Sequence, residues 1–137
     1  MIVGSGLLAK AFLHIYDKTE DVCIYAAGVS NSGCDDVAEF KREKERLTNA
    51  LMKLPETTVF VYFSTCSIYD EELRKTAYVK HKLAMEEIVK NSLNYLIFRL
   101  PQVVGVTPNP HTLMNYLYAR IERSESLKVW SKAKRNI

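Results

Sequence analysis

Tyr78 and Lys82 stand four residues apart, and the hydroxyl-rich run Ser64-Thr65-Cys66-Ser67 lies a short way upstream. On a helix, positions i and i+4 share one face, so the phenol and the ammonium would point into the same space. An ammonium beside a phenol favours the phenolate, so we expect Lys82 to lower the pKa of Tyr78. A hydroxyl from the upstream run could hold a substrate carbonyl or alcohol against it. These residues predict general acid/base chemistry at a substrate oxygen.

The start of the chain carries a glycine-rich turn that could hold a phosphate. A short apolar run, Met1–Val3, is followed by Gly4-Ser5-Gly6-Leu7-Leu8-Ala9 and then by an expected helix. This is the Gly-x-Gly-x-x-Ala form of the dinucleotide fingerprint in its strand–turn–helix context. Gly4 allows a tight turn, Gly6 lets a pyrophosphate approach the backbone, and Ala9 lets the helix pack close to its strand. The helix N-terminus offers free N–H groups to the phosphates.

Taken together, these residues resemble the extended short-chain dehydrogenase/reductase family, the NAD-dependent epimerase/dehydratase group that acts on nucleotide sugars. The segments that carry the resemblance are Val3–Ala9, Val22–Gly28, Val59–Tyr69 with Tyr78–Lys82, and Phe98–Gly105. They follow the family's order and span nearly the whole chain.

The resemblance implies a role for each of these residues. Tyr78 would take a proton from a sugar hydroxyl as hydride leaves for nicotinamide, Lys82 would hold the nicotinamide ribose, and Thr65 would hydrogen-bond the reacting oxygen. The cofactor, NAD or NADP, would be contacted by Gly4, Ser5, Gly6, Leu7, Leu8, Ala26, Ala27, Gly28, Tyr78, Lys82 and Pro101. The nucleotide-sugar substrate would be contacted by Ser67, Gln102 and Arg135.

Two departures from the family's pattern stand out. Members usually place two more strands, with their helices, between the glycine turn's helix and the Ala26-Ala27 strand, whereas only Asp17–Asp21 separate the two here. The acidic residue expected about 20 residues after the glycines, which would hold the adenosine ribose, has no obvious counterpart. In the family, a substrate-binding lobe would begin near the position of Arg135, and this sequence stops two residues later. We therefore expect a compact or truncated member, with residues 1–137 forming a single Rossmann-like dinucleotide-binding domain and the substrate lobe largely absent.

Length, charge and cysteine content limit the class of protein. The 137 residues suit one globular domain, and the net charge of +3, with basic and acidic residues interspersed, predicts no nucleic-acid partner. Three cysteines without metal-ligand spacing predict a reducing compartment, no disulfide framework and no metal site. Because no apolar run has the length of a membrane span and the N-terminus does not resemble a secretory signal, we expect a cytoplasmic protein without a membrane partner.

Short apolar strands alternate with helices, which predicts an α/β fold: a Rossmann-like parallel sheet with flanking helices and a reduced number of strands. The expected strands are Met1–Gly4, Val22–Ala27, Thr58–Ser64 and Tyr95–Arg99, with a further short one near Leu127–Trp130. The expected helices are Leu7–Tyr16, Asp36–Leu54, Thr76–Lys90 and His111–Glu122. The mixed charges of residues 41–46 predict a solvated helix face, and His81 is expected on a helix surface or in a loop.

The reduced strand number has a consequence for the sheet. The first strand would become a sheet edge, which needs protection from pairing with another chain. A homodimer, or a further C-terminal segment, could cover it. A crossover straight from the first strand to the Ala26-Ala27 strand would also remove the switch point where ligands usually bind.

Two functional classes therefore stay open. The first is an NAD(P)-dependent enzyme on a nucleotide sugar, which Thr65, Tyr78 and Lys82 favour. Dehydratases of the family often carry an acidic pair where this chain has Cys66 and Ser67, so an epimerase or a reductase is favoured. The second class is a non-catalytic dinucleotide-binding or oligomerising protein that retains the fold, which the missing ribose acid and substrate lobe favour.

Overall fold

The computed structural model describes residues 1–16, 21–92, 94–107, 109 and 112–127. The chain divides into two compact units, Met1–Leu100 and Pro101–Ile137. The first unit holds a parallel sheet with flanking helices, and the second contains α4 (Leu113–Glu122). The predicted α/β class with a Rossmann-like sheet is confirmed.

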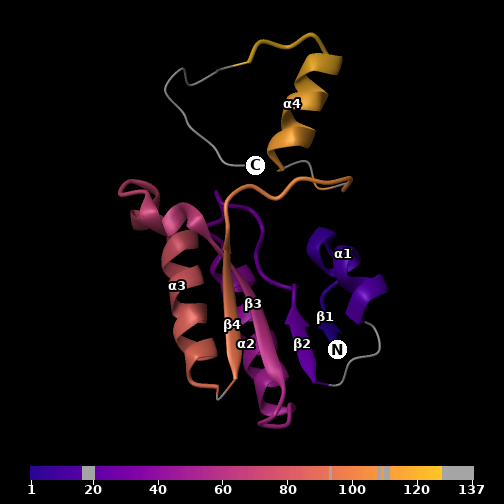
Figure 1. Cartoon of the computed structure of the whole chain (residues 1–137). Helices are drawn as coiled ribbons and strands as arrows, with labels where there is room; N and C mark the ends of the chain where they lie inside the picture. The colour runs from indigo at the N-terminus through magenta and orange to yellow at the C-terminus, as the bar shows by residue number, and fades with distance from the viewer. Residues whose placement is uncertain (17–20, 93, 108, 110–111, 128–137) are drawn as a thin grey trace. The chain divides into compact units, whose positions relative to one another are not determined.

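The described residues of the first unit form a four-stranded sheet in the order β1-β2-β3-β4 (Figure 1). The strands are β1 (Ile2–Val3), β2 (Val22–Tyr25), β3 (Val59–Thr65) and β4 (Tyr95–Leu100), and each pairs with its neighbour in parallel. Among these strands, spatial order follows chain order without a reversal. Within the part of the chain that the structure describes, the first strand lies at a sheet edge and the strand order has no switch point, as the sequence predicts.

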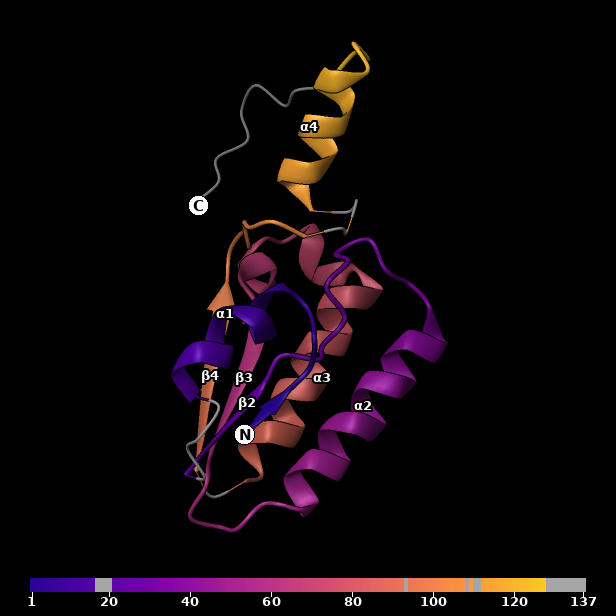
Figure 2. The same cartoon turned by 90° about the vertical axis from the view of Figure 1, so that its right-hand side faces the viewer.

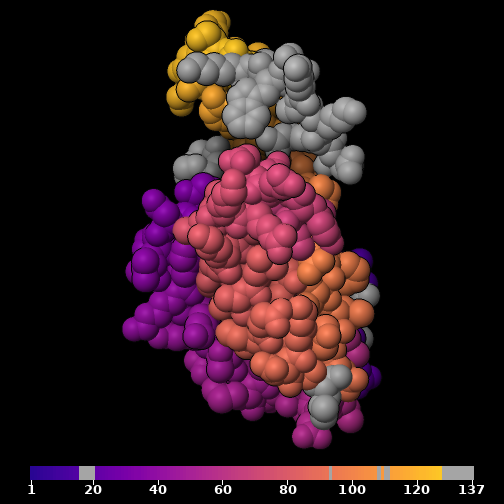
Figure 3. All heavy atoms as spheres, turned by 90° about the vertical axis from the view of Figure 1, so that its left-hand side faces the viewer, coloured from indigo at the N-terminus to yellow at the C-terminus, as the bar shows by residue number. Residues whose placement is uncertain are grey.

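Helices cover the two faces of the sheet unequally. Figure 2 shows α2 (Val37–Met52) and α3 (Ala77–Lys90) on one side and α1 (Leu7–Tyr16) on the other. Asp36 begins α2 by accepting the Ala38 N–H at 2.8 Å, and Thr76 begins α3 by accepting the Val79 N–H at 3.3 Å. In the space-filling view of Figure 3, α2 and α3 lie side by side on the surface of this unit.

The main core lies between the sheet and the α2–α3 pair. Its fully buried members are Cys23, Tyr25, Leu47, Phe60, Tyr62, Met85 and Val89. On the opposite face, Phe12 of α1 stacks on Phe63 of β3 with ring centroids 5.7 Å apart. Successive strand residues point to opposite faces, so Tyr62 packs with α2 and α3 while Phe63 packs with α1.

The second edge of the described sheet, β4, keeps apolar side chains exposed. Ile97 packs against the core, but its neighbours Leu96 and Phe98, which point to the opposite face, are 50% and 49% exposed. The Phe98 ring lies 6.2 Å from that of Phe63. The α1 face of the sheet is therefore only partly covered near this edge.

The predicted elements agree with the structure apart from their ends. β1 is shorter than expected because Gly4 has a φ of +130°, which ends the strand. The strand expected near Leu127–Trp130 lies outside the described residues except for Leu127, which is not in a strand. Among the residues that the structure describes, no helix is both long enough and apolar enough to cross a membrane.

Candidate functional site

The glycine turn lies between the end of β1 and the start of α1. A Cβ on Gly4 would lie 2.3 Å from the backbone oxygen of Ala26, so this position requires glycine for its close approach to the chain after β2. A Cβ on Gly6 would meet no atom within 4 Å. Ala9, in the first turn of α1, is fully buried, as its expected packing role requires. The backbone of Gly6 and the N-terminus of α1 thus present a surface that fits a pyrophosphate.

The segment after β2 passes directly over a pair of buried charges. Ala26 continues the strand by donating its N–H to the Val3 carbonyl at 2.7 Å. A Cβ on Gly28 would lie 2.8 Å from Glu43 Oε1 and 2.9 Å from Lys82 Nζ. Only a glycine lets the backbone run this close to both side chains without displacing their ends.

Tyr78, Lys82 and Thr65 come together at the carboxyl end of β3. Tyr78 and Lys82 lie one turn apart near the start of α3, and both are buried, with exposed fractions of 8% and 2%. Thr65 is the last residue of β3, and its Oγ1 accepts the Ser67 N–H at 3.1 Å. The Thr65 hydroxyl also lies close enough to Tyr78 to lower the pKa of the phenol, although among the described residues this contact falls short of regular hydrogen-bond geometry. The expected helix face and the expected threonine–tyrosine proximity are present.

A buried carboxylate on α2, Glu43, lies at the centre of this cluster. Its Oε1 accepts hydrogen bonds from the Tyr62 hydroxyl at 2.9 Å and from Lys82 Nζ at 3.2 Å. Its Oε2 accepts the Val29 N–H at 2.7 Å and lies 3.0 Å from His81 Nε2. Each carboxylate oxygen therefore has two partners, which saturates its hydrogen-bonding capacity.

These partners hold Glu43 in its ionised form. Burial alone would raise the pKa of the carboxyl, but the hydrogen bond from His81, the charge of Lys82 and the remaining donors lower it to about 2. An ionised carboxylate can only accept hydrogen bonds, so Nε2 of His81 must carry the proton in this contact. The His81 ring is further held by stacking on Phe40, with centroids 4.4 Å apart.

The expected effect of Lys82 on Tyr78 is wrong in this structure. Burial raises the pKa of Tyr78 to about 12, and the negative charge of Glu43 acts in the same direction, while only the contact with Thr65 opposes them. Burial also lowers the pKa of Lys82, although its contact with Glu43 counters this. The ammonium is paired with a carboxylate, so its charge does not act on the phenol alone.

Glu43 and His81 were both misassigned by the sequence patterns. The mixed charges of residues 41–46 predict a solvated face, yet Glu43 is only 2% exposed, and the His81 side chain is also buried. The position of Glu43 along its helix was the signal that could have predicted its burial. Glu43 stands three residues after Phe40 and four before Leu47, which is the spacing of the apolar stripe of α2.

A second buried acid lies two turns along α3 from Tyr78. Glu86 receives two hydrogen bonds from Arg99 of β4, at 3.1 Å from Nε and 2.7 Å from Nη2. Burial would raise the pKa of Glu86, but the Arg99 hydrogen bonds outweigh burial and lower it. Ser64 Oγ adds to this lowering, although its contact falls short of regular hydrogen-bond geometry among the described residues.

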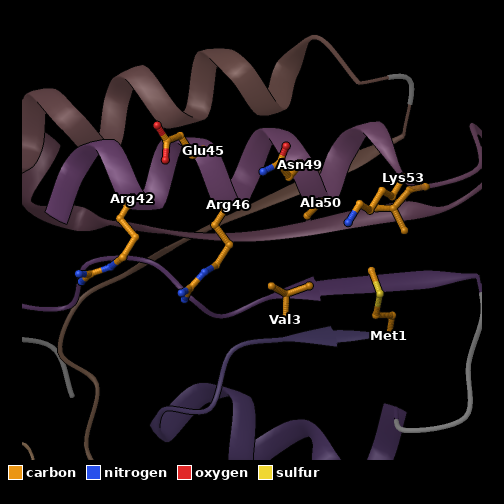
Figure 4. A pocket seen from close by; sticks show the side chains of 9 residues that line it. Met1, Val3, Arg42, Glu45, Arg46, Asn49, Ala50 and Lys53 are labelled. Atoms are coloured by element: carbon orange, nitrogen blue, oxygen red, sulfur yellow. The ribbon is translucent and has the colours of Figure 1, made fainter. Parts of the chain in front are cut away.

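A basic hollow of about 510 Å³ lies between α2 and β1 (Figure 4). Its described charged lining consists of Arg42, Arg46 and Lys53 with a single acid, Glu45. Figure 4 shows Arg42 and Arg46 extending from α2 toward the loop after β2. Both arginines also line a smaller hollow with Ala27, Gly28 and Val29. The two arginines therefore connect the basic hollow with the expected cofactor segment.

Four more of the expected site residues are Ser67, Pro101, Gln102 and Arg135. Ser67 lies in the short 3₁₀ helix Cys66–Tyr69 that follows β3. Pro101 and Gln102 belong to the second unit, and Arg135 lies outside the described residues. Within the part of the chain that the structure describes, no three His, Cys, Asp or Glu side chains gather in a way that could hold a metal ion.

A solved structure shares this fold. It is the crystal structure of the capsular polysaccharide assembling protein CapF from Staphylococcus aureus, with a TM-score of 0.58 and 18% sequence identity. The match covers 93% of this chain, which spans only 41% of the length of that protein. No curated protein is significantly similar in sequence.

A family-wide sequence comparison gives a broader match. Residues 9–136 match the family described as "NAD dependent epimerase/dehydratase family", whose members generally bind NAD(P). The matched span begins at the buried Ala9 of the glycine turn and includes β2, β3, α3 and β4. The chain therefore belongs to the NAD-dependent epimerase/dehydratase family.

Proposed function

We propose that the chain forms the dinucleotide-binding domain of an NAD(P)-dependent epimerase or reductase that acts on a nucleotide sugar. Thr65, Tyr78 and Lys82 would carry out the proton transfer. The single observation that carries this proposal is their convergence at the carboxyl end of β3, with the Thr65 hydroxyl close to Tyr78 and Lys82 one turn further along α3. A hydroxyl and a phenol on one substrate oxygen can orient it and exchange its proton.

The pyrophosphate part of the proposal is supported by the glycine turn. Gly6 leaves open space where a ligand can approach, and α1 begins directly after it at Leu7. The nicotinamide ribose would lie beyond Gly28, near Lys82. When bound, the nicotinamide supplies or accepts a hydride. The chain's own residues bind the cofactor, orient the substrate oxygen and move its proton.

Between the two dinucleotides, we propose NADP. The acid that would hold the 2′-hydroxyl of NAD has no obvious counterpart, whereas Arg42 and Arg46 reach from the basic hollow to the Ala27–Val29 segment. Arg42 is paired with Glu39 at 2.6 Å, but the Arg46 guanidinium has no hydrogen bond or ion pair with any described residue. A guanidinium suits the 2′-phosphate that distinguishes NADP from NAD.

The nucleotide-sugar part of the proposal has separate support. The structural relative is described as a capsular polysaccharide assembling protein, which is consistent with sugar chemistry. Ser67, in the 3₁₀ helix after Thr65, remains our candidate for contact with the sugar, and Gln102 and Arg135 remain our candidates for the diphosphate. Cys66 and Ser67 offer no carboxylate for an elimination step, which favours epimerisation or reduction over dehydration.

One observation favours the second candidate function, a dinucleotide-binding or oligomerising protein without turnover. The β4 edge exposes about half of Leu96 and Phe98, and such apolar side chains on an unpaired strand suit contact with a second copy of the chain. A homodimer formed in this way would retain the fold without requiring catalysis.

Two measurements separate these functions. Calorimetry with NAD and NADP tests binding, and the absorbance of the reduced nicotinamide in the presence of several nucleotide sugars tests turnover. We expect turnover that Tyr78→Phe abolishes while dinucleotide affinity stays within about twofold, because loss of one hydroxyl leaves the glycine turn intact. Binding without turnover would support the second function, and no binding at all would reject both.

A further inference from the structure

Glu43 is a buried charged group of the cluster to which the proposed mechanism gives no role. Isolated buried carboxylates are costly, so such groups require several compensating partners. Glu43 has four, from β3, α3 and the loop after β2. Ordinary packing would be served as well by an apolar residue at this point of the α2 stripe.

We propose that Glu43 is a positioning residue for the reaction at Tyr78: it fixes the Lys82 ammonium beneath Gly28 and places a negative charge close to Tyr78. This inference rests on the proposed function in one respect, namely that Tyr78 is the group that exchanges a proton with substrate. The position of Lys82 and the protonation of Tyr78 can be measured without any substrate.

The first step of the argument is the confinement of Lys82. Its side chain is 3% exposed, and its Nζ lies 3.2 Å from Glu43 Oε1 and 4.5 Å above the Tyr62 ring. Gly28 closes the space on another side, since a Cβ there would come within 2.9 Å of Nζ. A flexible four-carbon side chain is thereby held in one place, and Glu43 supplies its only carboxylate partner among the described residues.

The second step concerns the charge around Tyr78. The titratable groups of the buried cluster beside it are Tyr25, Glu43, Tyr62, His81, Lys82 and Glu86, and the 3₁₀ helix that packs on it through Ile68 adds Cys66 and Tyr69. Burial and the Glu43 charge raise the pKa of Tyr78 to about 12, against its ordinary value of 10.0. A phenol with its ordinary pKa is already protonated at neutral pH, so Tyr78 carries its proton there with or without Glu43; burial and the Glu43 charge both disfavour its phenolate.

A protonated phenol is suited to a particular direction of the reaction. A bound reduced nicotinamide would supply a hydride to a sugar carbonyl carbon, and Tyr78 would donate the proton that turns the carbonyl oxygen into a hydroxyl. The O–H bond of Tyr78 would break, and the phenolate would then recover a proton from water.

The test follows the titration of individual side chains by NMR, in protein labelled with carbon-13 at the tyrosine Cζ and lysine Cε positions. Tyr78→Phe and Lys82→Met assign the two signals. In Glu43→Gln, which keeps the size of the side chain, we expect the pKa of Tyr78 to fall by about one unit and that of Lys82 to fall as well. In Glu43→Asp, which keeps the charge, the pKa values of Tyr78 and Lys82 should both lie close to those of the wild type.

Glu86→Gln is the matched control. It removes a buried carboxylate from the neighbouring helix α3, but this carboxylate pairs with Arg99 and should leave the Tyr78 titration unchanged. If Glu43→Gln folds and Tyr78 titrates as in the wild type, the proposal is overturned. If the variant does not fold, Gly28→Ala decides, because its methyl group would displace the Glu43–Lys82 pair: a shifted Lys82 titration supports the proposal and an unchanged one overturns it.

The result of this experiment does not depend on whether the proposed function is correct. It uses no dinucleotide and no sugar, so a protein that binds neither can still show the shifts caused by Glu43. In that case the function would be rejected and the positioning of Lys82 retained. Conversely, dinucleotide binding with an unchanged Tyr78 titration in Glu43→Gln would retain the function and reject the role of Glu43.

Discussion

Gly28 and Lys82 approach so closely that a methyl group on the glycine would lie 2.9 Å from the lysine Nζ. One residue comes from the loop after β2 and the other from α3, so the contact ties two segments of the candidate site together. The atoms in the way are the ends of the Lys82 and Glu43 side chains. Gly28→Ala should therefore displace this ion pair while the backbone fold persists.

The glycine turn offers a contrast between two glycines. Gly4→Ala should destabilise the protein by at least about 2 kcal/mol, because its φ of +130° and the Ala26 backbone both exclude a side chain. Gly6→Ala should leave the free energy of unfolding unchanged, because its methyl group meets no atom within 4 Å. If pyrophosphate approaches here, however, the same methyl should weaken dinucleotide binding by about tenfold, or 1.4 kcal/mol.

Urea unfolding and calorimetry on the two variants check this pair of predictions. A Gly6→Ala protein that binds NADP as tightly as the wild type would exclude this turn as the pyrophosphate site. Gly4→Ala is the control: it shows that urea unfolding detects a loss of stability caused by a substitution in the same turn.

The choice between NAD and NADP should depend on Arg46. We expect NADP to bind at least about tenfold more tightly than NAD, and Arg46→Gln to remove most of this difference by removing a charge-assisted partner of the 2′-phosphate. Lys44→Gln removes one positive charge from the same helix α2 outside the hollow and should leave the ratio of the two dissociation constants unchanged. Equal affinities of the wild type for NAD and NADP would contradict the prediction.

The elements of the first unit could be predicted from the sequence because each has a local signal. Apolar runs gave the strands of a covered parallel sheet, and Asp36 and Thr76 marked helix starts through their side-chain oxygens. Tyr78 and Lys82 were found because both lie on one helix, where spacing alone fixes their relation. Their proximity to Thr65 followed from the family's pattern.

The electrostatics of the site could not be predicted in this way. Glu43 stands 39 residues before Lys82, so no spacing rule connects them, and only the packing of α2 against α3 brings them within 3.2 Å. The mixed charges around Glu43 predicted a solvent-exposed helix face. Its spacing from the apolar residues of α2 indicated instead that its side chain is buried. Without this carboxylate, Lys82 was expected to lower the pKa of Tyr78, and the structure gives the opposite direction.

The Glu86–Arg99 pair should stabilise the junction of α3 with β4. Arg99→Met leaves the fully buried Glu86 carboxylate without its bidentate partner, and we expect a loss of about 3 kcal/mol in the free energy of unfolding. Removing both charges in Glu86→Leu/Arg99→Met should cost less than the single Arg99 change, because no unpaired charge remains buried. Urea unfolding of the three proteins tests this, and a double variant less stable than Arg99→Met would contradict it.

The stability of the protein in acid should depend on Glu43. Its pKa lies at about 2 in the folded protein against an ordinary 4.5, so its ionised form stabilises the fold above about pH 4.5 and this stabilisation is lost as the pH falls toward 2. The shift corresponds to roughly 3 kcal/mol. Urea unfolding from pH 7 to pH 2 should show the difference between wild type and Glu43→Gln shrinking over this window. Glu39→Gln, which breaks only an exposed pair with Arg42, should differ from wild type by less than about 1 kcal/mol throughout. A wild-type advantage over Glu43→Gln that stays constant down to pH 2 would show that folding does not lower the pKa of Glu43, and would contradict the prediction.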